Sequence, residues 1–129
     1  MSKEKVMKKL MELRTGHAVS LLAYHIILVT KYRDKTLTIS DVAHVGVAAD
    51  SIAKVIELNF EADHVHILLQ AEPKYSPALL VQKIKGTSSR LIKIRNPDWR
   101  GWKIGYYVSS VSDNNLSTVE KYIQQQKGA

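Results

Sequence analysis

Two histidines separated by a single residue are the sharpest chemical feature of the sequence. His64 and His66 flank Val65 in a segment where apolar and polar residues alternate, as expected for a β-strand. A strand sends residues i and i+2 to the same face, so the two imidazoles would lie side by side. Neutral imidazole binds several divalent metals, which makes the pair a candidate metal site. The alternative is two polar residues on the solvent face of a half-buried strand, since two ligands alone do not make a site.

A tyrosine and a glutamine near the C-terminus form a second candidate pair. Tyr122 and Gln126 are four residues apart, which places them about one turn apart on one face of a helix. A phenol is a weak nucleophile at its ordinary pKa of about 10, but a nearby cation would stabilise the phenolate. The amide oxygen of Gln126 could bind the same ion. Considered alone, the pair is more typical of a ring packed on a sheet beside a solvated glutamine.

The charge of the chain suggests a polyanionic partner. Lys and Arg total 19 against 12 Asp and Glu, a formal net charge of +7. Nucleic acid is the commonest polyanion, although many basic domains are basic only for solubility. Basic residues gather around Lys31 and Arg33 and along residues 76–95, where a solvated helix face is the simpler explanation. The aromatic residues that could stack on unpaired bases, or else cover the core, are Tyr32, Tyr75, Trp99 and Trp102.

Length and composition predict one cytoplasmic domain. The 129 residues fit a single domain over 1–129, with 1–14 as a charged lead-in. The absence of cysteine excludes disulfides, thiolate metal sites and cysteine nucleophiles, and a reducing cytosol is the default. The N-terminal residues lack the apolar stretch of a signal peptide. The longest apolar run, around residues 20–30, contains His25 and is too short to span a membrane.

The pattern of apolar residues predicts an α+β fold. The expected elements are a strand over 17–31, a helix over 40–54 capped by Ser40 or Asp41, strands over 55–61 and 64–70 joined as a hairpin, a helix over 76–95, a strand over 104–112 and a helix over 117–127. The first six elements match the ferredoxin-like βαββαβ arrangement, an antiparallel sheet with two helices on one face. The seventh is a C-terminal helix that carries the tyrosine. This fold hosts many functions and does not decide between them.

Two apolar patterns predict which residues face the core. In the strand over 55–61, the residues on the buried face are Ile56, Leu58 and Phe60. In the helix over 76–95, the apolar stripe is Leu80, Ile84, Thr87, Leu91 and Ile94. The last helix has few apolar anchors, so it would be held weakly by its own domain and could move or dock on a neighbouring subunit.

Four stretches of the chain together carry a family resemblance. They are AYHIILVTKYR over 23–33, EADHVHIL over 61–68, KGTSSR over 85–90 and VEKYIQQQ over 119–126. In order and approximate spacing they resemble the small single-tyrosine HUH transposases, the TnpA proteins of the insertion-sequence-two-hundred-like group. The resemblance covers nearly the whole chain, from about residue 16 to residue 126, and four motifs in one order are far more specific than any one of them.

The resemblance implies a DNA transposase that acts as a homodimer on single-stranded DNA hairpins at the ends of an insertion sequence. It implies that His64, His66 and Gln126 bind Mg²⁺ or Mn²⁺. Tyr122 would attack the scissile phosphate and leave a 5′-phosphotyrosine link and a free 3′-OH. The candidate DNA contacts are Lys31, Arg33, Lys85 and Arg90.

Two alternatives stay open at the level of sequence. One is a non-catalytic nucleic-acid-binding module with the ferredoxin-like fold, and the other is an inactive, domesticated transposase. RNA-binding modules of this kind usually carry aromatic residues on two central strands, where this sequence places His64 and His66. That difference favours the transposase.

Overall fold

One four-stranded antiparallel sheet organises the computed structural model, which describes residues 21–111. The elements are β1 (Leu22–Val29), the 3-10 turn η1 (Lys31–Arg33), α2 (Ile39–Asp50), β2 (Lys54–Glu61), β3 (His64–Ala71), α3 (Pro77–Arg95) and β4 (Tyr107–Val111). The predicted lead-in over 1–14 and the predicted C-terminal helix, with Tyr122 and Gln126, lie outside the described residues.

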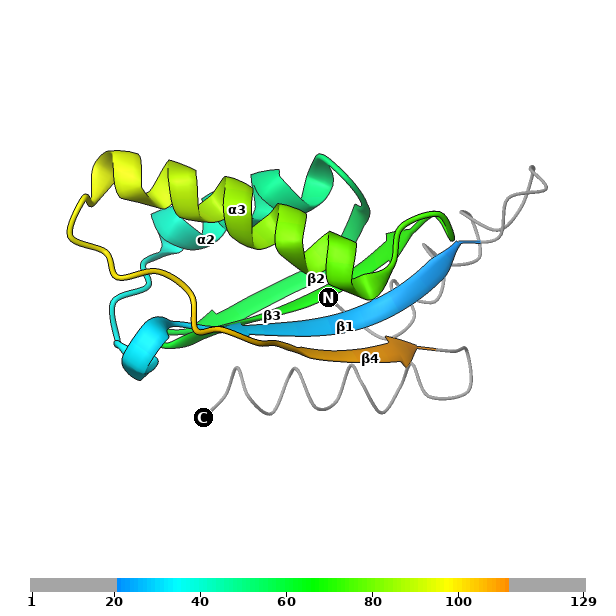
Figure 1. Cartoon of the computed structure of the whole chain (residues 1–129), viewed down its shortest axis with the longest axis horizontal. Helices are drawn as coiled ribbons and strands as arrows, with labels where there is room; N and C mark the ends of the chain where they lie inside the picture. The colour runs from blue at the N-terminus through cyan, green and yellow to red at the C-terminus, as the bar shows by residue number, and fades with distance from the viewer. Residues whose placement is uncertain (1–20, 112–129) are drawn as a thin grey trace.

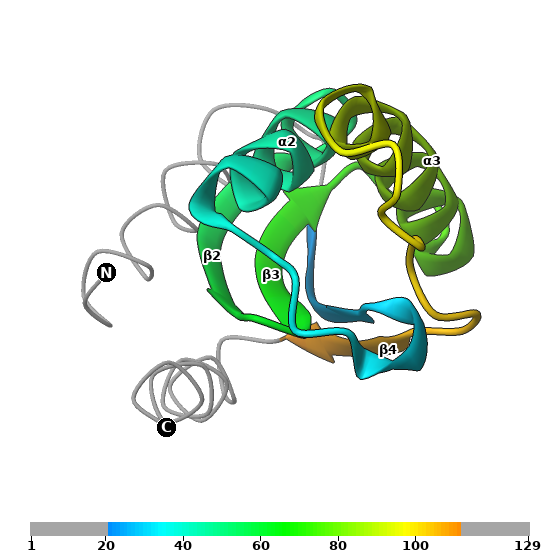
Figure 2. The ribbon, with the colours of Figure 1, turned by 90° about the vertical axis from the view of Figure 1, so that its left-hand side faces the viewer.

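The strands lie in the order β2-β3-β1-β4. Figure 1 shows α2 and α3 on the same side of this sheet, and Figure 2 shows the two helices side by side above it. This is the predicted ferredoxin-like βαββαβ arrangement. From Ala23 onwards, β1 residues at both parities are buried or partly buried, in agreement with the apolar residues that the sequence places at both parities.

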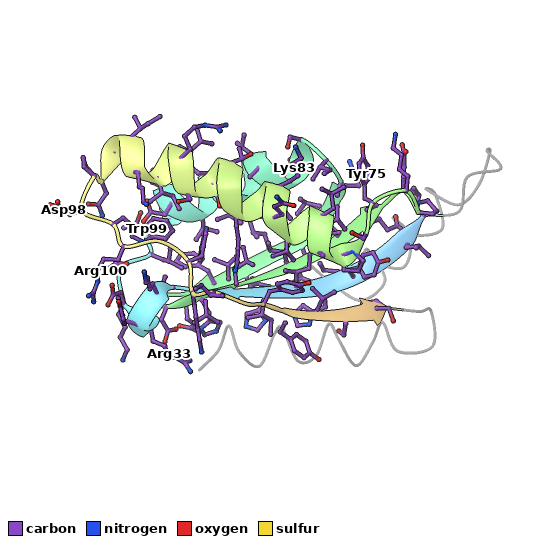
Figure 3. The ribbon with its side chains drawn as sticks, in the orientation of Figure 1. Arg33, Tyr75, Lys83, Asp98, Trp99 and Arg100 are labelled. Carbon is purple, nitrogen blue, oxygen red and sulfur yellow. The ribbon has the colours of Figure 1, made fainter. Side chains whose placement is uncertain are left out.

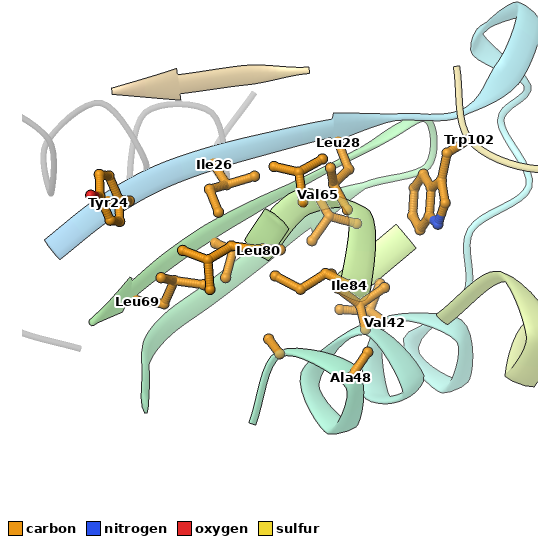
Figure 4. Packing of buried hydrophobic residues seen from close by; sticks show 14 of the residues in the cluster. Tyr24, Ile26, Leu28, Val42, Ala48, Val65, Leu69, Leu80, Ile84 and Trp102 are labelled. Carbon is orange, nitrogen blue, oxygen red and sulfur yellow. The ribbon is translucent and has the colours of Figure 1, made fainter. Parts of the chain in front are cut away.

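The hydrophobic core fills the space between the sheet and the helices (Figure 4). Ile26 on β1 pairs with Ile67 on β3, and both are fully buried. Leu80 and Ile84 of α3 and Val45 of α2 close the same core from the helical layer. This packing fixes one face of β3, so its opposite face carries His64 and His66 as the alternation predicts.

The helix ends differ from the sequence prediction for identifiable reasons. The N-cap of α2 is Thr38, whose side chain accepts from the Asp41 backbone N–H while the Asp41 carboxylate accepts from Thr38 N–H. The predicted helix over 40–54 ends instead at Asp50, because Lys54 already pairs with Gln70 in the sheet. The predicted caps and boundary were therefore wrong by a few residues.

A β-bulge changes which residues of β2 face the core. The register shifts between Val55 and Glu57, so strict alternation does not hold there. Val55, rather than Ile56, packs on the core together with Leu58 and Phe60. The predicted last strand over 104–112 begins only at Tyr107, since Gly105 adopts a φ of 91° in the preceding loop.

The buried residues of α3 recur mainly every four positions, and one of them is polar. They are Leu80, Val81, Ile84, Ser88 and Ile92. Ile94, predicted to face the core, is 72% exposed. Ser88 is tolerated inside because its hydroxyl donates to the Ile84 carbonyl at 2.6 Å and accepts from Trp102 Nε1 at 3.0 Å. Over residues 21–111 the structure contains no helix that is long and apolar enough to cross a bilayer.

Candidate functional site

The two histidines of β3 lie together on the sheet face opposite α2 and α3. Their ring centroids are 4.9 Å apart and the ring planes meet at 75°. His66 is 2% exposed, and His64 is only partly exposed. The pair is therefore not the solvated surface pair that was the alternative interpretation of the sequence.

A third histidine, His25 on β1, completes a row of rings on the same face. In the sheet register His66 lies opposite Ile27, which places His25 at the diagonal position. His25 Nε2 is 3.1 Å from His66 Nδ1, and the two rings stack with centroids 5.3 Å apart and an interplanar angle of 11°. No role was predicted for His25 from the sequence. Its signal was a lone polar residue inside an otherwise apolar strand.

The other ligand candidate, His64, is held by its neighbour in the turn between β2 and β3. His64 Nδ1 lies 2.7 Å from Asp63 Oδ1. The second carboxylate oxygen of Asp63 lies 3.4 Å from Arg33 Nε, an exposed contact. Partial burial by itself raises the pKa of Asp63, but hydrogen bonds and charge from His64, then from Arg33, outweigh it and lower that pKa. Asp63 is therefore a carboxylate that orients the ring of His64.

Burial keeps the two central histidines neutral. Desolvation lowers the pKa of His25 to about 4. Desolvation, followed by the charges of His25 and His64, lowers the pKa of His66 to about 4 as well. Neutral imidazole is the form that binds metals, so His66 is ready to act as a ligand near neutral pH without losing a proton.

The two imidazoles could supply two nitrogen donors to a divalent metal ion. In both His64 and His66, Nδ1 contacts a neighbouring side chain, so Nε2 is the nitrogen with which each ring would bind an ion. Such outer contacts to the second ring nitrogen are a regular feature of metal-binding histidines. Residues 21–111 contain no group of three His, Cys, Asp or Glu placed to hold a metal. Further ligands would come from elsewhere, and the predicted ligand Gln126 lies outside the described residues.

A basic pocket lies near the end of β1, next to the turn that carries Asp63. It has a volume of about 470 Å³ and is lined by Lys31, by Lys85, Gly86, Ser89 and Lys93 of α3, and by residues 100–105. Lys, Arg and Gly dominate this lining, and it contains no acidic residue. The pocket is close to the histidine turn because the backbone N–H of Thr30 donates to Asp63 and that of Lys31 donates to Gly101. This concentration of positive charge suits an anion such as a phosphate group.

Lys85 lines this pocket and bonds to the loop on its opposite side. Its Nζ donates to the carbonyls of Lys103 at 2.8 Å and Gly105 at 2.6 Å. Partial burial lowers the pKa of Lys85. The side chain thus ties α3 to the loop that precedes β4, and its role as a DNA contact stays a prediction.

Arg100, which lines the pocket, contacts an aspartate and a tyrosine that lie outside the pocket lining. Arg100 makes a two-pronged contact with Asp34 at 2.6 and 2.7 Å, and its guanidinium carbon lies 4.4 Å from the centre of the Tyr32 ring. Figure 3 shows Arg33 and Arg100 at the same end of the molecule. Tyr32 is 67% exposed and has a φ of 60°, a conformation that is uncommon outside glycine.

The remaining predicted nucleic-acid contacts separate into surface and core residues. Arg90 is exposed on α3 but does not line the pocket. Trp99 and Trp102 are buried and contact each other edge to face, so they are core residues and do not offer a face to a base. Lys93 and Lys103 line the pocket but were not predicted as individual DNA contacts. For Lys103 the sequence signal is a basic residue next to the aromatic residues of 99–102.

Comparisons with known proteins agree with this architecture. Residues 18–126 match the family model described as "Transposase IS200 like". The chain is 32% identical over 130 residues to the ISDra2 transposase TnpA of Deinococcus radiodurans, covering 90% of this chain and 92% of that protein. It is 30% identical over 117 residues to the transposase for insertion sequence element IS200 of Salmonella typhimurium, covering 80% of this chain and 75% of that protein.

The structural comparison gives the same answer. The crystal structure of a Deinococcus radiodurans R1 protein assigned as a transposase superimposes with a TM-score of 0.64 at 29% sequence identity. The match covers 90% of this chain and 99% of that one. With the family model spanning most of the sequence and relatives matched over most of their length, the chain belongs to the family of IS200-like transposases.

Proposed function

We propose that this transposase cuts and rejoins single-stranded DNA with a tyrosine nucleophile, Tyr122, at a centre that holds Mg²⁺ or Mn²⁺. The proposed protein ligands are His64, His66 and Gln126. The observation that supports the proposal is the adjacent histidine pair, in which each Nδ1 contacts another side chain, so that Nε2 is the nitrogen that would bind the ion. When bound, the ion would polarise the scissile phosphate and stabilise the charge that develops on the leaving oxygen.

The chemistry proposed for Tyr122 is a transesterification that conserves the energy of the cleaved bond. The phenolate oxygen forms a bond to phosphorus while the bond from phosphorus to the 3′ oxygen breaks. Tyr122 gives up its phenolic proton to solvent before the attack, and the leaving 3′ oxygen takes up a proton from solvent. The products are a 5′-phosphotyrosine and a 3′-OH. Attack by another 3′-OH reverses the step and joins strands without an external energy source.

The proposed DNA partner is a hairpin at the end of an insertion sequence, bound by a homodimer. The basic pocket near the end of β1 supports DNA binding, because Lys31, Lys93 and Lys103 present positive charge with no acidic residue in the lining. Tyr32 supports it as well, since its exposed ring could stack on an unpaired base beside the pocket.

A covalent adduct tests the catalytic proposal. End-labelled single-stranded hairpin DNA is incubated with the protein and Mn²⁺, and a protein–DNA adduct that survives denaturing electrophoresis is expected. Tyr122→Phe should abolish the adduct while DNA binding persists, and His66→Ala should do the same. Tyr106→Phe is the matched control, since this tyrosine is half exposed and belongs to the loop before β4. Binding without an adduct, across a broad set of element-end sequences, would instead indicate the non-catalytic module or an inactive transposase.

A further inference from the structure

His25 is a buried ring with a directed contact to a proposed metal ligand. It is 3% exposed and stacks on His66, and its Nε2 approaches His66 Nδ1 to 3.1 Å. Tyr107 of β4 contacts the ring edge on, with centroids 6.1 Å apart. A ring enclosed in this way has little freedom to rotate, so the contact is a fixed feature of the sheet.

The direction of the hydrogen bond follows from what a metal ligand requires. A neutral imidazole carries a single proton. If His66 uses Nε2 for the ion, its proton must lie on Nδ1, and the group that faces Nδ1 must be an acceptor. His25 Nε2 can accept when the proton of His25 lies on its own Nδ1. We infer that His25 is a positioning residue of the metal centre, whose Nε2 accepts the Nδ1–H of His66 and holds that ring in the tautomer and orientation that direct Nε2 to the ion.

The two ligand rings are therefore oriented by different chemistries. Asp63, a carboxylate 2.7 Å away, holds His64, whereas a neutral imidazole holds His66. His25 and His66 are 3% and 2% exposed, and such burial favours the neutral form of an imidazole, so the contact between the rings fixes the tautomer. The inference rests on the proposed metal site, because the orientation of His66 affects metal binding only if His66 is a ligand. The tautomer of His66 can be observed in the metal-free protein.

Nitrogen chemical shifts test the inference directly. The full chain is labelled with ¹⁵N-histidine, and the imidazole tautomers are read from long-range ¹H–¹⁵N spectra in EDTA, with His66 assigned by its loss in His66→Ala. His66 is expected as the Nδ1–H tautomer and His25 as an acceptor through Nε2. An Nε2–H tautomer of His66 in the wild-type protein overturns the inference without recourse to any variant.

Variants of His25 separate hydrogen bonding from space filling. His25→Phe keeps a ring that can stack on His66 but removes the acceptor, whereas His25→Gln offers an amide oxygen as acceptor. We expect the affinity for Mn²⁺, measured by electron paramagnetic resonance, to fall by about 10- to 100-fold in His25→Phe and to recover most of that loss in His25→Gln. Unchanged affinity and an unchanged His66 tautomer in His25→Phe would mean that His25 only fills space.

A buried residue on the same face supplies the matched control. Gln70 is 1% exposed on β3, and its side chain makes no hydrogen bond within residues 21–111. Gln70→Leu should leave both the His66 tautomer and the Mn²⁺ affinity unchanged. Failure of the proposed function has a different signature: His64→Ala and His66→Ala would bind Mn²⁺ like the wild type, while the His66 tautomer would still change in His25→Phe.

Discussion

Asp63 Oδ1 lies 2.7 Å from His64 Nδ1, in the two-residue turn that joins β2 to β3. The turn geometry and the ligand geometry are thus coupled, since the residue that reverses the chain also orients the first histidine of the pair. The backbone carbonyl of Asp63 in addition accepts from the N–H of Thr30 at 3.0 Å, which ties the turn to the end of β1. The turn is consequently held from both sides before any ligand binds.

Removing the charge of Asp63 should weaken metal binding without unfolding the turn. In Asp63→Asn the amide keeps the size of the side chain but loses the carboxylate that favours the Nδ1–H form of His64. We expect about a 10-fold loss of Mn²⁺ affinity, measured by titration calorimetry, because outer partners of metal ligands typically contribute that much or more. Arg33→Gln is the control, since it removes only the exposed 3.4 Å contact to the same carboxylate. Equal losses in the two variants would show that the effect comes from the Arg33 contact instead.

Acid should destabilise the fold before the carboxylates titrate. The pKa values of His25 and His66 are lowered to about 4 in the folded protein, whereas the unfolded chain takes up protons near the ordinary pKa of about 6.5. Between these values the unfolded state binds more protons, so stability is retained above pH of about 6.5 and is lost as pH falls toward about 4. Each ring contributes a slope of up to about 1.4 kcal/mol per pH unit.

Urea unfolding in EDTA at a series of pH values measures this slope. In His25→Phe one titrating ring is absent, so the curve should be shallower over the same window. A free energy of unfolding that stays constant from pH 7 to pH 5 in the wild type would contradict the neutral, buried state of the two rings.

The order of the elements and the histidine pair could be predicted from the sequence, because both depend on local periodicity. Alternation in β3 placed His64 and His66 on one face, and hydrophobic content at both parities marked β1 as central. The role of His25 could not be predicted in this way. Its contact with His66 joins residues 41 positions apart and depends on the β1–β3 register, which no local pattern encodes.

Three further features also depend on contacts between different elements. The bulge at Val55 and Glu57 inserts a residue that alternation cannot anticipate, so the inward face of β2 changes there. Ser88 breaks the apolar stripe of α3, yet it is buried because Trp102, 14 residues further along the chain, donates to its hydroxyl. The pocket likewise combines α3 with residues 100–105, and its shape depends on their packing.

Ser88→Ala should cost stability although it places a more apolar residue in the core. The indole Nε1–H of Trp102, which donates to Ser88 at 3.0 Å, would be left as a buried donor without an acceptor. The expected loss is about 1 to 3 kcal/mol of unfolding free energy, measured by urea denaturation. Ser89→Ala, at the neighbouring partly exposed position of the same helix, is the control and should change stability far less. A gain in stability for Ser88→Ala would mean that the indole finds another partner.

Lys85→Met should loosen the loop before β4. Methionine keeps an unbranched apolar chain of similar reach but cannot donate to the carbonyls of Lys103 and Gly105. We expect faster amide hydrogen exchange over residues 101–107 and little change in β1 and β3. Lys83→Met is the matched control, because Lys83 is exposed on the same helix and does not line the pocket. Identical exchange in both variants would remove Lys85 as the anchor of the loop.

The lysines of the pocket should set the salt dependence of DNA binding. Lys93 and Lys103 are exposed and line the pocket, so each is expected to neutralise a phosphate. The measurements use a Tyr122→Phe background, which separates binding from cleavage. The logarithm of the DNA association constant falls as the logarithm of the salt concentration rises, and each Lys→Ala variant should make this slope less steep by about 0.7 to 0.9. Affinity should fall uniformly across hairpin sequences, because phosphate contacts carry no sequence information.

Lys54→Ala, at the start of the edge strand β2 and outside the pocket lining, is the control. Fluorescence anisotropy from about 50 to about 200 mM salt measures the slopes. If all three variants share the wild-type slope, the DNA backbone does not pass through this pocket.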